Sequence, residues 1–295
     1  PYYLFSTLVR STPIIICAMA VGVSWRAGYI NLGVEGQMVT GTLVATVVAL
    51  FMPGPDILVV IVAWIAGMAA GAVYALIPAV LNWKFGVSMV ITTLMMNYVA
   101  TQLVAYYLKV FVKNGSGVLT PMPEFGLPVI GGQAYLLNVL IVAVVTVLVY
   151  VYLKYSKQGY EISVVGESEN TARYVGINVK KVIIRTMLLS GALCGIAGLL
   201  LVGGTNHTIS TTTVGGRGFT AIMVSWLGKF DPFYMVLTSA LLVFLDKGAQ
   251  QVSTDFRISS SISDIVTGII LLFIIGCEFF LQYRIVKNKN RKENA

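Results

Sequence analysis

The sequence predicts an all-α, polytopic membrane protein, and three of its features support this fold class. Hydrophobic residues make up 57% of the 295 residues and charged residues only 11%, whereas a soluble domain carries about 25% charged residues. The mean hydropathy is +0.84. The apolar residues form continuous runs instead of the alternation typical of membrane β-barrel strands, and a helix of about 20 such residues crosses a bilayer.

Nine apolar stretches are suited to be membrane segments, and we expect residues 1–295 to form a single transmembrane domain. The segments are residues 8–25, 31–52, 57–81, 87–108, 135–153, 186–204, 212–228, 233–250 and 262–283. The seventh contains Gly215, Gly216 and Gly218, a composition that allows a broken or only partly inserted segment. Non-helical backbone is tolerated at membrane depth where protein or a water-filled cavity surrounds it.

Small residues recur at helical spacing within these segments. The pairs are Gly67 with Gly71, Gly191 with Gly195, and Cys194 with Gly198. Such spacing lets membrane helices approach one another closely, so it predicts a tightly packed bundle.

The distribution of Lys and Arg predicts how the segments cross the membrane. Basic residues concentrate in the loop 154–185 and in the tail 284–295, and such residues gather on the cytoplasmic side. Nine alternating crossings then leave 14 of the 20 Lys and Arg residues inside and six outside. The outer group includes Arg217, either as a solvated loop residue or as a contact for an extracellular protein. The Gly- and Pro-rich loop 109–134 also lies outside and is expected to be irregular.

The loop 154–185 is predicted to contain structure of its own. A short helix is expected to start at Ser168, to continue through Val175 and to end at Gly176, because glycine is common at helix C-termini. Asn178 is suited to cap the next helix, which carries three basic residues toward the membrane. Two helices separated by a glycine form a compact unit that a simple linker would not need.

The sequence lacks the residue patterns of common catalytic sites. It has one histidine, His207, no G-x-x-x-x-G-K-[ST] phosphate loop and no metal-ligand spacing. The three cysteines, Cys17, Cys194 and Cys277, lie in different apolar segments without disulfide spacing and are read as packing residues. Membrane orientation explains the net charge of +8 better than nucleic-acid binding does. Transport is therefore the leading function class, and no enzyme activity is expected.

The stretch "GYINLGVEGQMVTG" (28–41) places a carboxylate, Glu35, and two amides, Asn31 and Gln37, among four glycines. An ionisable residue in a membrane segment is costly and suggests a function. One hypothesis is that Glu35 and Asn31 line or gate the inner end of a translocation path. The other is that Glu35 forms local hydrogen bonds that hold the loop. The glycines and amides fit both.

A second polar pair lies in the segment 87–108. Thr93 and Asn97 are four residues apart, so they share one face of a helix. Asn97 is suited to bind a ribose hydroxyl or the edge of a base. An interhelical hydrogen bond is the alternative.

Three stretches together resemble the permease subunits of bacterial ABC importers, in the superfamily that handles nucleosides, simple sugars and branched-chain amino acids. They are "AGYINLGVEGQMVTG" (27–41), "GVSMVITTLMMNYVA" (86–100) and "VGESENTARYVGINVKKVIIRTMLLSGALCGIAGLL" (165–200). The resemblance covers about residues 25–283. The sequence departs from the family pattern at Ser88-Met89, where an Asn-Glu pair is expected.

The resemblance implies a multi-pass permease in the bacterial cytoplasmic membrane, with about nine to ten transmembrane helices and a fold similar to the cobalamin-importer permease. It implies a homodimer or heterodimer of permeases, two cytoplasmic ATPase subunits and an extracellular solute-binding lipoprotein. ATP and magnesium would bind the ATPases, and this chain would bind no cofactor. Since importer permeases usually begin in the cytoplasm, we expect one more helix before Pro1.

The resemblance also implies roles for individual residues. The path residues would be Asn31, Glu35, Gln37, Thr93 and Asn97, and the most favoured solute is a nucleoside. The alternatives are a ribose-type sugar and, from another class, an ion-coupled secondary transporter, which should carry more charged residues in mid-helix.

Residues 166–178 would form the coupling segment that docks on the ATPase. Glu167, Glu169 and Arg173 are expected at its polar rim, Ala172, Val175 and Ile177 at its apolar centre, and Gly176 at its break. The alternative is a solvated loop whose charges only set the topology.

Overall fold

The structure is a computed structural model that describes residues 2–111, 136–206, 208–257 and 259–282. Most of the predicted loop 109–134, the tail 284–295 and His207 lie outside the described residues. The helices are α1 (Tyr2–Arg26), α2 (Val34–Phe51), α3 (Asp56–Phe85), α4 (Met89–Phe111), α5 (Leu136–Tyr155), α6 (Lys157–Glu167), α7 (Glu169–Tyr174), α8 (Val179–Leu201, continued by a π-helical turn, Val202–Asn206), α9 (Arg217–Leu227), α10 (Pro232–Asp255) and α11 (Ser260–Gln282).

Seven helices of the described part of the chain are long and apolar enough to cross a membrane, namely α1, α2, α3, α4, α5, α8 and α10. Each coincides with a predicted segment, which confirms the polytopic helical class. The 11 residues of α9 span only about 16 Å, roughly half of a hydrocarbon core about 30 Å thick. The seventh predicted segment, 212–228, is therefore not a full helical crossing. The described apolar stretch of α11 is Ile265–Ile274, so the crossing at 262–283 stays a prediction.

The packing divides the chain into two units, residues 1–241 and 242–295. The second unit contains the last part of α10 and α11. Side chains pair along α10, where Gln250 Nε2 donates to Asp246 Oδ2 at 3.0 Å. The candidate sites described below lie in the first unit, and the single domain expected over 1–295 stays a prediction.

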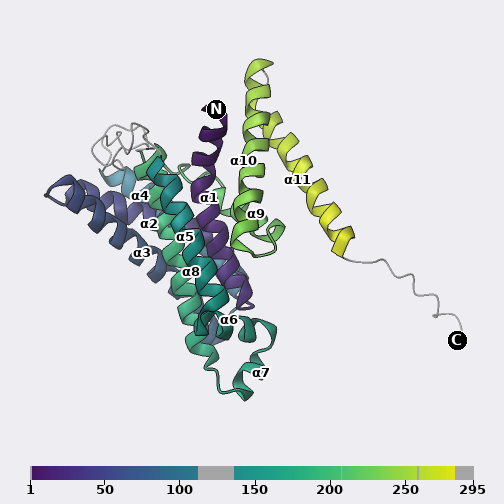
Figure 1. Cartoon of the computed structure of the whole chain (residues 1–295). Coiled ribbons are helices and arrows are strands. Elements are labelled where there is room, and N and C mark those ends of the chain that lie inside the picture. The colour runs from purple at the N-terminus through teal and green to yellow at the C-terminus, as the bar shows by residue number, and fades with distance from the viewer. Residues whose placement is uncertain (1, 112–135, 207, 258, 283–295) are drawn as a thin grey trace, which may run out of the picture. The chain divides into compact units, whose positions relative to one another are not determined.

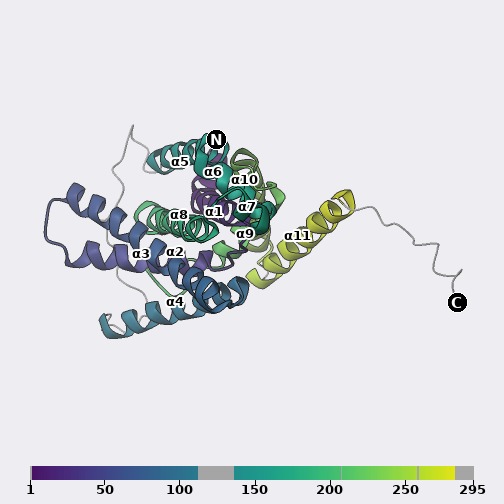
Figure 2. The same ribbon diagram turned by 90° about the horizontal axis from the view of Figure 1, so that it is seen from below.

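Two helices, α1 and α8, form the centre of the bundle in the first unit. Other parts of the chain bury 83% of the transmembrane stretch of α1 and 78% of that of α8. α8 packs against α1, α2 and α3, while α2 also contacts α4, and α1 also contacts α5 and α9. Figure 2 shows α4 and α5 on opposite sides of this centre. α6 and α7 lie together at one end (Figure 1). The basic residues of the loop 154–185 predict that this is the cytoplasmic end, and the name is used for it below.

Glycines bring α8 into backbone contact with its neighbours. A Cβ atom on Gly191 would lie 2.6 Å from the Cβ of Ala75 and 2.8 Å from the carbonyl carbon of Gly71, both on α3. A Cβ atom on Gly195 would lie 2.8 Å from the Cα of Met68. Real Cβ atoms do not approach other atoms this closely, so the tight packing predicted from the glycine spacing is confirmed at this crossing.

Candidate functional site

The candidate site is built around a non-helical segment, residues 27–33, that joins α1 to α2. The chain turns at Gly28, whose φ is +81°, and α2 does not begin until Val34. Ser190 Oγ accepts from Asn31 at 3.1 Å and donates to the carbonyl of Ala20 at 2.9 Å. Ala20 lies six residues before the end of α1, about 9 Å along the helix. Asn31 is therefore inside the bundle. α2 begins at Val34, three residues after the predicted start of this segment at residue 31.

The first layer of the site is a pair of side-chain amides, Asn31 and Gln37, that form two reciprocal hydrogen bonds. Asn31 Nδ2 donates to Gln37 Oε1, and Gln37 Nε2 donates to Asn31 Oδ1, both at 3.2 Å. Asn31 Oδ1 also accepts from the Gly33 N–H at 3.0 Å. Asn31 and Gln37 are fully buried. Each side-chain nitrogen and oxygen of this pair therefore has a partner within the chain.

The second layer comes from α4, where Thr93 and Asn97 face the start of α2. Thr93 Oγ1 accepts from the Leu32 N–H at 3.2 Å. Asn97 Oδ1 accepts from the Gly36 N–H, and Asn97 Nδ2 donates to the carbonyl of Leu32, both at 2.8 Å. These bonds satisfy backbone groups near the start of α2 that have no partner within a helix. Inside a membrane such groups cannot bond to water instead.

Glu35 connects the start of α2 to the start of α9. Its Oε1 accepts from the Gly216 N–H at 3.0 Å, while its Oε2 is buried and has no hydrogen-bond partner among the described residues. A Cβ on Gly218 would lie 2.7 Å from the Glu35 nitrogen, so the two helix starts are in backbone contact. Both helices thus point their N-termini, which favour negative charge, toward the Glu35 carboxylate.

The position of Arg217 corrects the expectation that it lies in an outer loop. It is the first residue of α9, beside Glu35, and its Nη1 donates to the carbonyl of Thr213 at 2.9 Å. α9 ends near the cytoplasmic end of α1, where the rings of Phe230 and Trp25 stack with centroids 5.1 Å apart. α9 therefore covers the cytoplasmic half of the bundle, and Arg217 lies at its inner start.

The structure brings the five predicted path residues into one cluster, but it distinguishes Glu35 from the rest. The polar side-chain atoms of Asn31, Gln37, Thr93 and Asn97 are bonded to the chain itself, which favours the interpretation that they hold the segment 27–33. Glu35 keeps one buried oxygen without a partner in the described residues. Sequence reasoning missed Ser190 and Gly216, because only the folded chain brings them to residues 31 and 35.

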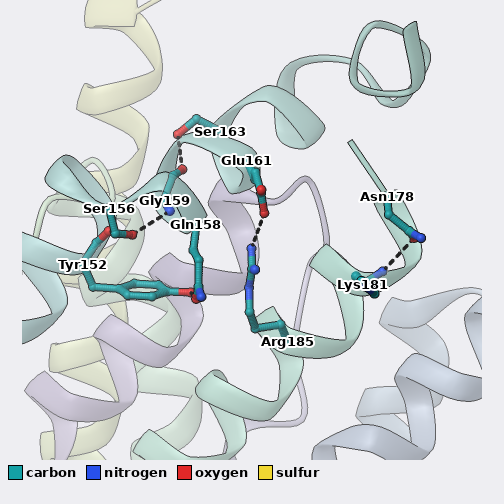
Figure 3. Close-up of polar contacts among 9 residues, drawn as sticks. All are labelled: Tyr152, Ser156, Gln158, Gly159, Glu161, Ser163, Asn178, Lys181 and Arg185. Carbon is teal, nitrogen blue, oxygen red and sulfur yellow. Dashed lines mark hydrogen bonds and ion pairs between the residues drawn. The ribbon is translucent and has the colours of Figure 1, made fainter. Parts of the chain in front are cut away.

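A second candidate site is the pair of short helices at the cytoplasmic end, α6 and α7. The predicted capping residues of α7 and α8 are confirmed: Ser168 Oγ accepts from the Thr171 N–H at 3.3 Å, and Asn178 Oδ1 accepts from the Lys181 N–H at 3.2 Å. α7 ends at Tyr174, one residue before the predicted end, and α6 was not predicted. Gly176 has a φ of +79°, the left-handed conformation expected of a glycine that ends a helix. Figure 3 shows the Asn178 cap.

Three contacts attach this helix pair to the bundle. Arg185 Nη2 of α8 donates to Glu161 Oε2 of α6 at 2.9 Å (Figure 3). A Cβ on Gly166 would overlap the carbonyl of Arg26, so the end of α6 lies directly against the end of α1. The Tyr29 hydroxyl donates to Glu169 Oε1 of α7 at 2.5 Å. Burial and this hydrogen bond raise the pKa of Tyr29 well above its usual value, so the hydroxyl remains a donor at physiological pH.

The exposed surface of the helix pair differs from the one predicted. Ala172, expected at the centre of a docking surface, is 0% exposed and packs inside the chain. Val175, also expected at this centre, is 64% exposed, and Tyr174, which was not predicted there, is 92% exposed. Ile177 is half-buried, and Glu167 is exposed. The sequence could not distinguish the two sides of so short a helix, because six residues make fewer than two turns.

Fold and site together define a class: a multi-pass helical membrane protein with a non-helical segment inside its bundle and a pair of short helices at the end predicted to be cytoplasmic. Residues 3–275 match the family described as "Branched-chain amino acid transport system / permease component". The chain belongs to this permease family.

Relatives with assigned names are ABC-transporter permeases. The chain is 30% identical to a glucose ABC transporter permease protein of Haloferax volcanii, over 99% of this chain and 80% of the relative. It is also 30% identical to a guanosine ABC transporter permease protein of Bacillus subtilis, over 100% of this chain and 86% of the relative. A nucleoside ABC transporter permease protein of Lactococcus lactis is 28% identical, over 96% and 81% of the two chains.

Proposed function

We propose that this chain is the permease subunit of an ABC importer for a nucleoside. The observation that carries the proposal is that a single permease family covers both the bundle and the cytoplasmic helix pair. Two of the relatives named above are permeases for guanosine and for nucleosides, which supports a nucleoside as the solute. The glucose permease keeps a simple sugar as the second candidate.

The proposed assembly follows from what this chain lacks and from what it exposes. ATP and magnesium would bind two partner ATPases, because the sequence has no phosphate loop of its own. A second permease subunit would complete the translocation path, and an extracellular binding lipoprotein would deliver the solute. This chain would bind no cofactor and catalyse no reaction.

We infer two routes by which movement of a docked ATPase reaches the membrane. The first is α8, which follows α7 directly and holds α6 through the Arg185–Glu161 ion pair. The second is the segment 27–33, which contacts α7 through Tyr29 and continues to Glu35 within a few residues. The second route ends at the one path residue that has a buried, unpartnered oxygen among the described residues.

Uptake measurements test the proposed solute. In a strain that lacks the gene, uptake of labelled guanosine should fall and should return with the wild-type gene, while uptake of labelled glucose should not change. Loss of glucose uptake alone would replace the nucleoside with a sugar. Unchanged uptake of both would contradict the proposal.

Charges placed on the exposed surface of α7 should detach the ATPase. In the double variant Tyr174→Asp/Val175→Asp, two exposed apolar side chains become acidic without any change in the membrane helices. Because an anchoring residue at an interface contributes about 2 kcal/mol or more, we expect binding to weaken at least about 30-fold and the ATPase to be lost on co-purification. ATP hydrolysis should no longer respond to the loaded binding protein.

Ser163→Asp is the matched control, since it adds an acidic group at an exposed position of α6. It should leave both the complex and transport intact. A double variant that still co-purifies with the ATPase at wild-type yield would show that α7 is not the docking surface.

Glu35→Gln should impair transport more than folding. Glutamine retains an oxygen that can accept from the Gly216 N–H but replaces the ionisable carboxyl group between the two helix starts with a neutral amide. We expect solute uptake to fall at least about tenfold, equivalent to about 1.4 kcal/mol, with unchanged abundance in the membrane. Parallel loss of abundance and uptake would instead assign Glu35 a structural role, and normal uptake at normal abundance would contradict both.

A further inference from the structure

A groove of about 460 Å³ opens at the cytoplasmic end between α3, α7 and the start of α8. This volume is within the range of about 300–1,000 Å³ found for small-molecule sites. The groove is lined by Tyr29, Asn82, Trp83, Glu169, Arg173, Ile177, Asn178, Val179, Lys180 and Ile183. None of these residues belongs to the cluster around Glu35.

The charges in the groove favour an anionic ligand. Glu169 is the only acidic lining residue, and its two oxygens already accept from the Tyr29 hydroxyl and from Arg173 Nη2, the latter at 3.4 Å. Lys180 forms no ion pair with a carboxylate within the described residues. Its ammonium lies 3.3 Å from the centre of the Trp83 ring. Lys180 and Arg173 therefore give the groove a positive charge that is not fully neutralised.

The position of the groove favours a lipid. Trp83 lies in the last turn of α3 and Lys180 in the first turn of α8, at adjoining ends of two helices that are long and apolar enough to cross a membrane. Tryptophan and lysine are the side chains that mark the headgroup level of a bilayer. From Trp83, a stripe of exposed apolar residues runs along α3 toward the membrane interior, formed by Val80, Ile77 and Val73. An acyl chain of a lipid bound in the groove would lie along this stripe.

The proposed ATPase contact lies elsewhere on α7. Glu169 and Arg173, which line the groove, are four residues apart and share one side of the helix. Tyr174 and Val175 are exposed and do not line the groove. The groove is thus separate from the surface proposed to dock the ATPase.

We propose that this groove binds the phosphate of an anionic phospholipid headgroup, with Lys180 and Arg173 as its cationic contacts and Trp83 as its wall. Basic pockets between membrane helices on the cytoplasmic side are suited to such headgroups. The bound lipid would connect α7 to the ends of α3 and α8 and would make the position of α7 sensitive to the anionic lipid content of the membrane.

Native mass spectrometry of the full-length permease tests this assignment. The protein is purified in mild detergent with equal amounts of phosphatidylglycerol and phosphatidylcholine, and retained lipids are counted. We expect wild type to retain phosphatidylglycerol and Lys180→Gln to retain about fivefold less, the change that corresponds to about 1 kcal/mol per cationic residue at an anionic surface. Lys180→Arg should restore retention, and Lys157→Gln, an equal charge change at an exposed residue of α6, should have no effect.

Several results would overturn the proposal. Equal retention by wild type and Lys180→Gln would remove the groove as the lipid site, and equal retention of both lipids by wild type would remove the preference for anions. Displacement of the lipid by millimolar inorganic phosphate would identify a soluble phosphate compound as the ligand. Displacement by the purified ATPase would identify the groove as a protein contact.

Discussion

Gly191→Val should nearly abolish accumulation of the protein in the membrane. Gly191 lies where α8 crosses α3, and even a Cβ there would come within 2.8 Å of the Gly71 carbonyl carbon. The obstacle is backbone, which cannot rotate away as a side chain can, so the two helices must separate. We expect a cost of about 3 kcal/mol or more, at the upper end of the range for overpacked cores. Because proteins are only about 5–15 kcal/mol more stable than their unfolded states, this is a large loss.

Gly248→Val is the matched control for this effect. Gly248 lies in α10, and a Cβ there would meet no atom within 4 Å. Membrane abundance and the unfolding temperature of the solubilised protein should therefore stay close to wild type in Gly248→Val and fall sharply in Gly191→Val. Equal behaviour of the two variants would show that the close α3–α8 contact does not determine stability.

Features that depend on neighbours in sequence could be predicted from the sequence. Ser168, Gly176 and Asn178 were expected to start and end the cytoplasmic helices, and the structure places each in that role. Hydrophobic runs likewise identified the helices long enough to span a membrane. In both cases the signal lies within one or two helical turns, or in the length of an apolar run, so no knowledge of the tertiary packing is needed.

Features that depend on the packing of distant segments could not be predicted. The sequence places Glu35 near the cytoplasmic turn, but the segment 27–33 is held inside the bundle by the hydrogen bond that Asn31 donates to Ser190 and by the one that Asn97 donates to the carbonyl of Leu32. The close contact between the start of α9 and the start of α2, at Gly218 and Glu35, is likewise a product of the tertiary packing and not visible in the hydropathy. Ala172 was expected at a surface contact, but it is buried in the structure. Its burial depends on how the folded chain packs around α7, which the sequence alone does not show.

Asn97→Leu should destabilise the protein because it removes both partners that Asn97 supplies to the start of α2. The Gly36 N–H and the Leu32 carbonyl would lose hydrogen bonds that are both 2.8 Å long. Each buried group left without a partner costs about 1–3 kcal/mol, so the total is about 2–6 kcal/mol. No water replaces these bonds inside a bilayer. We expect membrane abundance to fall severalfold and the unfolding temperature of the remaining protein to drop.

The same helix offers a control at Thr92, whose hydroxyl donates to the carbonyl of Ser88, the residue just before α4. Thr92→Val replaces a hydroxyl with a methyl group of similar size and leaves the segment 27–33 unchanged. Abundance should therefore stay near the wild-type level. Uptake, divided by abundance, separates the two roles considered for Asn97. If Asn97 only holds the start of α2, the Asn97→Leu protein that remains folded should transport at a near-normal rate per molecule. If Asn97→Leu instead accumulates normally but transports no solute, the bonds to Gly36 and Leu32 are not essential for folding, and Asn97 acts in the path.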